Sequence, residues 1–197
     1  TAPDHIHAQI GPNPRIVDSD IWAKILQAAL TLSEIDIQPV EMSISNTPTY
    51  PLEMVQAVAL IWIFGGLRNN EIRRLQLGCI RIEDETDMDT TQPVILRIPA
   101  NKTSGRFEKP ISNLAAKALL EWEAIRPATA PLLDTKTSEM CHFLFVYRGR
   151  RLGTSYINHC LIPMLCAKAN IPLNDTKGKI TSHRARATIS NALVTGE

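Results

Sequence analysis

The chain has 197 residues, of which 44% are hydrophobic and 21% charged, so it is long enough to form one sizeable core, or one domain with an arm. Its longest apolar run, residues 54–67, is interrupted by Gln56 and by two glycines. The run is shorter than the roughly 20 apolar residues that a membrane span needs, so we expect no membrane helix. The four cysteines form no CxxC pair and no metal-ligand spacing with the five histidines. We therefore expect a soluble protein of the reducing cytoplasm, without a disulfide framework, a metal or a cofactor.

The net charge is only +1, but the two halves of the chain differ in sign. Residues 1–98 hold 7 Lys+Arg against 13 Asp+Glu, whereas residues 99–197 hold 14 against 7. This asymmetry predicts one basic face, where a polyanion can bind with release of its counterions.

Two helices are predicted in the first part of the chain, after an aperiodic, proline-rich arm over residues 1–15. Residues 20–32 carry apolar side chains at helical spacing, with Asp18 or Ser19 as the N-cap. Residues 52–64 are apolar on nearly all sides, which is typical of a helix buried in the middle of a domain. The glycine pair that follows is expected to end this helix.

A short helix and a small sheet are predicted next. Asn69 or Asn70 can cap a helix over residues 71–77, which places Arg68 in the turn between two helices. Strand patterns then predict a small three-stranded antiparallel sheet over residues 79–83, 94–99 and 106–112.

The second half of the chain is mainly helical, with one short buried strand. Pro163 is expected to bend or interrupt one of its helices. The helices are predicted over residues 113–125, 155–169 and 181–196, and the strand over residues 142–147. The fold class is therefore α+β and mainly helical, with helices around the small three-stranded sheet.

Four residues in this pattern could carry chemistry, although each also has an ordinary explanation. Arg68 could extend from a helix end into solvent, and Lys102 on a hairpin tip is a common way to protect a sheet edge. His183 and Arg186 lie three residues apart near a helix start, where their side chains project together and anions bind readily. Pairs of this kind usually face solvent only.

Taken together and in this order, the motifs resemble those of the tyrosine recombinase catalytic domain, in the phage integrase superfamily. The matching stretches are GLRNNEI with Arg68 and Glu71, NKTSG with Lys102, and SHRARATI with His183 and Arg186. The segment between the second and third stretches also resembles the family's strand, turn and helix. The residues of the last motif are similar to those of the transposon-encoded branch of the family.

The resemblance implies a role for each matching residue. Strand transesterification builds negative charge on the nonbridging phosphate oxygens, and Arg68 and Arg186 would bind both of them. Lys102 would protonate the 5′ leaving oxygen as general acid, and His183 would assist proton transfer or bind the phosphate. Glu71 would hold its neighbours in position. No metal is required, because the arginines supply the positive charge.

Further basic residues are candidate contacts to the phosphates of double-stranded DNA. Arg106 and Lys109 are also alternatives to Lys102 as proton donor, although phosphate contact is the role we expect of them. The candidates are Arg106, Lys109, Arg150, Arg151, Lys177 and Lys179.

The resemblance also implies a domain division. Residues 16–197 would form the catalytic domain, and residues 1–15 would be the linker from a missing N-terminal DNA-binding domain.

The family's nucleophilic tyrosine and a further His or Trp box follow the His-x-x-Arg motif, but only 11 residues follow Arg186 here and none is a tyrosine. We therefore expect this fragment to be an inactive monomer and the full-length protein to act as a tetramer on DNA through a phosphotyrosine intermediate. The tyrosines of this chain lie elsewhere, at positions 50, 147 and 156, and we expect them to pack or to contact DNA.

Three alternatives stay open at this point. The chain could be a DNA-binding module with a degenerate recombinase fold that does not cut. It could be a type IB topoisomerase domain, which uses a similar set of charges, although the short distance from GLRNNEI to the hairpin suits recombinases better. It could also be an unrelated helical protein with chance motif matches, which predicts no affinity for DNA.

Overall fold

The computed structural model describes residues 16–37, 49–82, 94–100 and 105–195. The predicted arm over residues 1–15, the acidic loop between the first two predicted strands and the Lys102 hairpin tip lie outside these ranges.

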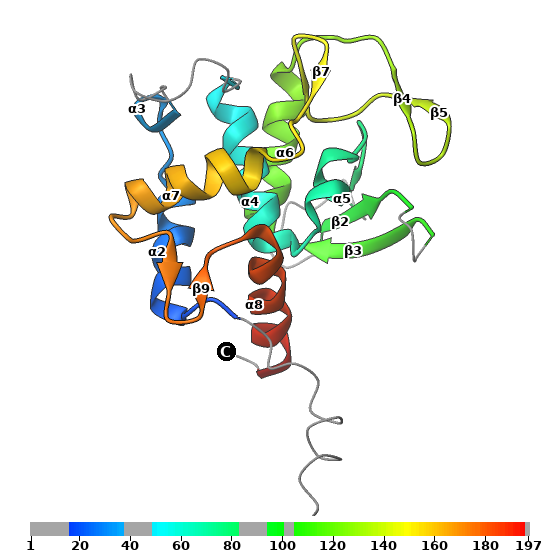
Figure 1. The fold of residues 1–197 in the computed structure, drawn as a ribbon. Coiled ribbons are helices and arrows are strands. Elements are labelled where there is room, and N and C mark those ends of the chain that lie inside the picture. Colours follow the sequence, from blue (N-terminus) through cyan, green and yellow to red (C-terminus); the bar gives the residue numbers. More distant parts are fainter. Residues whose placement is uncertain (1–15, 38–48, 83–93, 101–104, 196–197) are drawn as a thin grey trace, which may run out of the picture.

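Helix α4 (Leu52–Gly65) lies at the centre of the molecule (Figure 1). Ten of its fourteen residues are buried, as its nearly uniform apolarity predicts. It packs against α6 (Asn113–Ile125), α2 (Ser19–Leu30) and α8 (Ser182–Thr195). Because each buried aliphatic or aromatic side chain stabilises the fold by roughly 1.5–3 kcal/mol, α4 provides a rigid support for the segments that follow it.

The shorter helices surround this core. Helix α5 (Asn69–Arg73) follows α4 directly, and α3 (Glu34–Ile37) follows α2. The predicted helix around Pro163 begins as a π-helical segment, η1 (Ile157–Leu161), and continues as α7 (Ile162–Lys168). The Ile162 amide donates to the Ile157 carbonyl, five residues back, just before the proline. Pro163 has no N–H, so the change of helix type at this point agrees with the predicted interruption.

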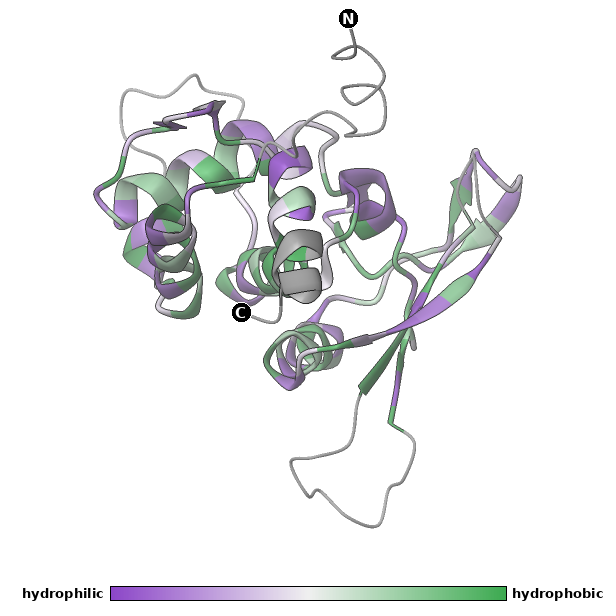
Figure 2. Cartoon of the chain, turned by 90° about the horizontal axis from the view of Figure 1, so that it is seen from below, coloured by the Kyte–Doolittle hydropathy of each residue, from purple (hydrophilic) through white to green (hydrophobic). Residues whose placement is uncertain are grey.

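The predicted three-stranded sheet is present, with slightly shorter strands. It consists of β1 (Ile80–Arg81), β2 (Val94–Ile98) and β3 (Phe107–Ile111) in that order, all antiparallel. Leu96 in β2 is buried and lies opposite Lys109 in β3, whereas the neighbouring Arg97 is exposed. In Figure 2 the sheet extends to one side of the helices, so only one of its faces is covered by the core.

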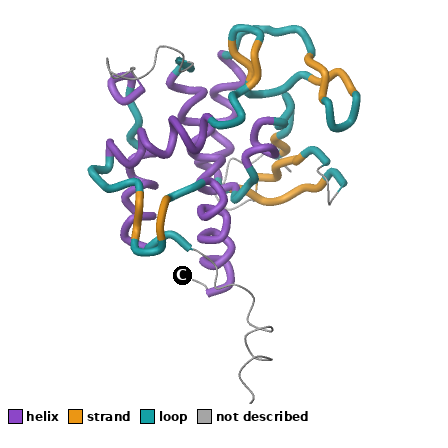
Figure 3. Tube along the Cα trace, viewed as in Figure 1, coloured by secondary structure: helices purple, strands orange, loops and turns teal. Residues whose placement is uncertain are grey.

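Three further hairpins were not predicted (Figure 3). They are β4 (Leu132–Asp134) with β5 (Glu139–Cys141), β6 (Val146–Tyr147) with β7 (Arg150–Arg151), and β8 (Asn174–Asp175) with β9 (Gly178–Lys179).

The strand predicted over residues 142–147 is buried, but only its last two residues are a strand. The Leu144 amide donates to the Leu75 carbonyl, and the Leu144 carbonyl accepts from the Trp122 indole at 3.0 Å. The same pairing explains why α5 is shorter than the predicted helix over residues 71–77. After Arg74 the chain leaves the helix to run beside residues 142–144.

None of the helices among the described residues has the length and apolarity that a membrane crossing requires.

Candidate active site

The glycine turn after α4 places Arg68 at the start of α5. Gly66 has φ +57°, a left-handed conformation that ends α4 and that glycine adopts without strain. Arg68 is the N-cap of α5, and about half of its side chain is exposed. The chain therefore leaves the buried helix and presents a guanidinium at the surface within two residues.

Glu71 fixes both the backbone and the side chain of Arg68. One of its oxygens, Oε2, accepts from the Arg68 amide at 2.8 Å, and Oε1 accepts from the Arg68 Nη1 at 3.1 Å. The Glu71 side chain is only 3% exposed, so the ion pair is anchored from the inside of the molecule. This geometry is the one expected of a residue that orients Arg68.

Helix α8 packs against the glycine turn. A Cβ atom placed on Gly66 would lie 3.5 Å from the Ile189 Cγ2. Arg186 is three residues before Ile189, so the two side chains share one face of α8. The amide of Ser182 donates to the Asn158 side chain at 2.8 Å, which fixes the start of α8 against η1. Arg186 is thereby directed to the region where α4 ends and α5 begins.

Lys109 on β3 connects these segments. Its ammonium donates to the Gly65 carbonyl at 2.6 Å, at the C-terminal end of α4. Burial lowers the pKa of Lys109, the Arg186 guanidinium lowers it further, and Glu71 opposes this effect. Arg186 on α8 and Glu71 on α5 thus both act on the charge of Lys109. The Lys109–Gly65 hydrogen bond and the position of Ile189 beside Gly66 bring β3 and α8 together at the end of α4.

Arg186 contributes a donor without an acceptor. Its Nη1 atom is buried and has no hydrogen-bond partner among the described residues. A buried donor left in this state costs roughly 1–3 kcal/mol, and the cost is recovered if a ligand supplies the acceptor. Among the described residues, Arg68, Lys109 and Arg186 supply three positive charges to this cluster, and Glu71 supplies one negative charge. The arrangement can bind an anion with several oxygens.

The two remaining residues of the predicted site are His183, which is exposed, and Lys102, which the structure does not describe. His183 is exposed on the first turn of α8, three residues before Arg186 and on the same face. Lys102 lies outside the described residues, on the tip between β2 and β3. The structure thus pairs Arg68 with Glu71 and packs α8, the helix that carries His183 and Arg186, against the glycine turn before Arg68.

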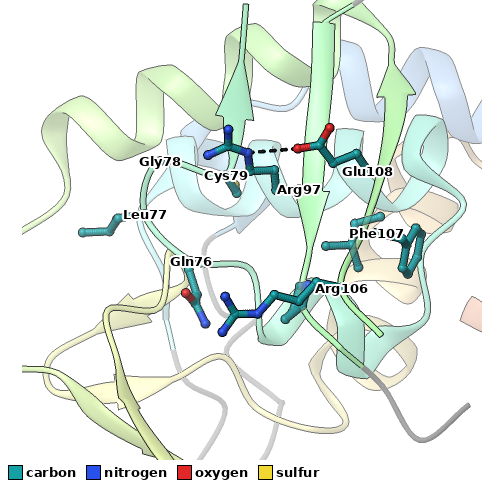
Figure 4. Close-up of a pocket in the computed structure, with 10 residues that line it drawn as sticks. Gln76, Leu77, Gly78, Cys79, Arg97, Arg106, Phe107 and Glu108 are labelled. Atoms are coloured by element: carbon teal, nitrogen blue, oxygen red, sulfur yellow. Dashed lines mark hydrogen bonds and ion pairs between the residues drawn. The ribbon is translucent and has the colours of Figure 1, made fainter. Parts of the chain in front are cut away.

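Arg106 lies away from this cluster, at a pocket of about 760 Å³ beside the sheet (Figure 4). Its guanidinium pairs with Glu139 at 3.2 Å and is 70% exposed. On the same pocket, Arg97 pairs with Glu108 at 3.1 Å. The basic side chains of this pocket therefore already have carboxylate partners, unlike Arg186.

The other predicted phosphate contacts lie on two of the hairpins. Arg150 is exposed on β7, whereas the Arg151 guanidinium stacks 3.9 Å from the centroid of the Phe143 ring. On the β8–β9 hairpin, Lys179 is exposed, and Lys177 lies 3.9 Å from an Asp18 carboxylate oxygen. Arg150, Lys177 and Lys179 are thus open to solvent, while Arg151 is held against the protein.

The sequence did not single out two buried arginines, Arg74 and Arg184, that position the site helices. Arg74 ends α5 and pairs with Asp134 at 2.6 Å, and Arg184 in α8 pairs with Asp175 at 2.6 Å. Both acidic partners lie on hairpins made of very short strands, which leave no periodic signal in the sequence. A pattern search has no means of pairing them.

The three tyrosines of the chain form one aromatic cluster. Tyr50 and Tyr156 are buried with ring centroids 4.8 Å apart, and the Tyr147 ring lies 6.4 Å from Tyr50. The Tyr50 hydroxyl accepts from the Gly153 amide at 3.2 Å. Burial raises the pKa of both Tyr50 and Tyr156, so their phenols are harder to ionise. Packing accounts for these side chains.

Among the described residues, no group of three or more His, Cys, Asp or Glu is arranged to hold a metal ion.

Solved structures of recombinases have the same fold as this chain. The XerH site-specific recombinase bound to difH substrate aligns with 93% of the chain at a TM-score of 0.59 and 16% identity. The XerA recombinase aligns with 100% at 0.56 and 19% identity. The Tn1549 transposon integrase in complex with circular intermediate DNA aligns with 94% at 0.54 and 15% identity. The chain has the fold of a tyrosine recombinase catalytic domain.

The recombinase fold agrees with the α+β class predicted from the sequence. Neither a protein-family model nor a curated protein sequence matches the chain at a significant level. The chain covers 44%, 56% and 54% of the XerH, XerA and Tn1549 chains, respectively, so it corresponds to about half of each.

Proposed function

We propose that residues 16–197 form the catalytic domain of a tyrosine-type DNA recombinase, integrase or transposase. The observation that carries this proposal is the buried Nη1 of Arg186, which lacks an acceptor among the described residues, on the helix that packs against the turn before Arg68. A phosphate group supplies the missing acceptor and neutralises the excess positive charge. DNA is the proposed source of that phosphate, since the fold is shared with the DNA-bound XerH and Tn1549 proteins.

The proposed reaction is strand transesterification. A tyrosine oxygen attacks the phosphorus atom, the bond from phosphorus to the 5′ oxygen breaks, and the 5′ oxygen takes up a proton. Arg68 and Arg186 stabilise the negative charge on the nonbridging oxygens of the transition state, with Glu71 orienting Arg68. Lys102 donates the proton to the leaving oxygen, and His183 assists proton transfer or binds the phosphate.

The nucleophile is proposed to come from outside residues 1–197, because the three tyrosines of this chain pack against one another. In this proposal residues 1–15 link the domain to an N-terminal DNA-binding domain, and the full-length protein assembles as a tetramer on DNA. Residues 1–197 alone would bind DNA as a monomer without cutting it. A covalent adduct between this fragment and a nicked DNA substrate would contradict that part of the proposal.

The first test is a salt titration of DNA binding. Fluorescence anisotropy of a labelled duplex would be measured between about 50 and 200 mM KCl for the wild type, Arg68→Ala and Arg186→Ala. We expect affinity to fall steeply with salt. Each arginine variant should bind roughly 10-fold to 100-fold more weakly, because a charge-assisted hydrogen bond contributes about 1.5–3 kcal/mol.

Lys117→Ala is the matched control, since Lys117 is an exposed cation on α6 whose ammonium lies 3.8 Å from a Glu121 carboxylate oxygen. It removes the same charge from another element and should bind nearly as the wild type does. Circular dichroism would verify that each variant is folded. Equal losses for all three variants, or no binding at the lowest salt, would refute the proposed phosphate site.

A further inference from the structure

Lys109 lies outside the three sequence motifs, yet the structure places it in the cationic cluster. It is on the inner face of β3, opposite the buried Leu96, and its side chain is half-buried. Its ammonium donates one hydrogen bond, at 2.6 Å, to the Gly65 carbonyl. An ammonium has three protons, so two donors remain for other acceptors.

Among the described residues, positive charge exceeds negative charge around Lys109. The groups that influence it are Arg186 from α8 and Glu71 from α5, in addition to the Gly65 carbonyl at the end of α4. Both carboxylate oxygens of Glu71 accept hydrogen bonds from Arg68. Two cations in a half-buried place repel each other, and burial makes this repulsion less screened than in water. An anion between Lys109 and Arg186 removes the repulsion.

A purely structural role does not require this arrangement. A lysine that only binds the last carbonyls of α4 stabilises the helix end without a second cation beside it. In this chain the second cation is Arg186, and it has a buried Nη1 that also lacks an acceptor among the residues the structure describes. One acceptor group with several oxygens satisfies both side chains together.

We propose that Lys109 is a third cationic ligand of the same phosphate group that Arg68 and Arg186 bind. This inference rests on the proposed function and assigns Lys109 a role different from that of Lys102. Lys102 would give up its proton to the leaving oxygen, whereas Lys109 keeps its proton and donates a hydrogen bond to a nonbridging oxygen. The Gly65 carbonyl holds the Lys109 ammonium in place before DNA binds.

The proposal predicts a change in protonation on DNA binding. In the free protein, burial and Arg186 hold the pKa of Lys109 below its ordinary value. A phosphate anion beside the ammonium favours the charged form and raises this pKa. Between the two pKa values, DNA binding takes up a proton, so the affinity for DNA decreases as the pH rises through the pKa of the free protein.

The experiment is an NMR titration of the lysine ¹³Cε resonances with and without a saturating short DNA duplex. The Lys109→Arg variant identifies the Lys109 resonance, because that signal disappears. We expect the pKa of Lys109 to rise by roughly one unit or more when DNA is bound, as for a charge partner within hydrogen-bonding distance. Lys117 on α6 provides a control in the same spectra, and its resonance should not move when DNA is added.

A charge variant gives a second measurement. Lys109→Gln keeps an N–H donor but removes the charge, and it should weaken DNA binding roughly tenfold at neutral pH, whereas Lys109→Arg should retain most of the affinity. An unchanged Lys109 pKa, or wild-type affinity of Lys109→Gln, overturns the inference. If Arg186→Ala still weakens binding in that case, the proposed function stands and only the role of Lys109 is wrong. If the wild-type chain binds no DNA, both the proposed function and the role of Lys109 are contradicted.

Discussion

At each of the two site helices one arginine is buried and makes several hydrogen bonds, whereas a second arginine is more exposed and makes fewer. Arg74 at the end of α5 and Arg184 in α8 are buried and paired with carboxylates. Arg68 at the start of α5 is half-exposed, and Arg186 in α8 has a buried donor without an acceptor in the described part of the chain. An arginine therefore stabilises the fold at one position, while another arginine a few residues away stays available to a ligand.

The neutralised arginines connect segments that are distant in the chain. Arg74 donates to Asp134 from Nε and Nη2, at 2.9 and 2.6 Å, and to the Ala100 carbonyl from Nη1. Arg184 donates to both oxygens of Asp175, at 2.8 and 2.6 Å, and to the carbonyls of Ile16 and Gly178, among others. These bonds fix α5 against β2 and β4, and α8 against the β8–β9 hairpin.

In this comparison the two paired guanidiniums, of Arg74 and Arg184, are buried and make three or more hydrogen bonds each. Arg68 and Arg186 are less buried, and Arg186 keeps a donor without an acceptor among the described residues. A fully paired guanidinium has no capacity left for a phosphate, whereas one with an empty donor position binds a phosphate without losing other bonds. The predictions below test this separation.

The largest expected effect is on stability. Asp134→Ala leaves the buried Arg74 without its carboxylate and should reduce the free energy of unfolding by about 3–5 kcal/mol. Urea denaturation followed by circular dichroism measures this. Arg186→Gln, in contrast, should change the free energy of unfolding by less than about 1 kcal/mol, because it removes a charge that the protein does not pair. Equal losses for the two variants would show that the separation is wrong.

A smaller effect is expected at the glycine turn that orients Arg68. Gly66→Ala imposes a left-handed conformation on a residue with a Cβ, which costs roughly 1–2 kcal/mol, and places that Cβ 3.5 Å from Ile189. Thermal unfolding should show the loss, and DNA affinity should fall more than for Gly78→Ala. Gly78 also has a positive φ, but a Cβ added there would meet nothing within 4 Å among the described residues, so it is a matched control for the left-handed conformation. Similar effects of both variants on DNA binding would contradict a specific role for this turn.

The sequence predicted the elements that have a strong periodic pattern. The all-apolar pattern of α4 and the alternation in β2 predicted the central helix and the sheet, and the glycine pair predicted the turn at Arg68. The β4–β5, β6–β7 and β8–β9 hairpins have strands of two or three residues, which are too short to show a period.

The site was predictable only in part, for a physical reason. The motif order and the His-x-x-Arg spacing pointed to Arg68, Glu71 and Arg186, but they assigned no role to Arg184, two residues before Arg186. Their difference depends on Asp175, which reaches Arg184 only in the folded chain. The contact between Lys109 and the Gly65 carbonyl joins residues 44 positions apart, so no local pattern reveals it.

The most direct test of the central claim is a double-mutant cycle for DNA binding with Arg68→Gln, Arg186→Gln and the double variant. If the two guanidiniums bind one phosphate, the double variant should lose less affinity than the sum of the single losses, with a coupling energy of about 1 kcal/mol or more. Lys109 and Glu71 are unchanged in all four proteins, so the coupling reports on the two arginines alone. Losses that add within about 0.3–0.5 kcal/mol would mean that Arg68 and Arg186 act at separate places, and would contradict the account.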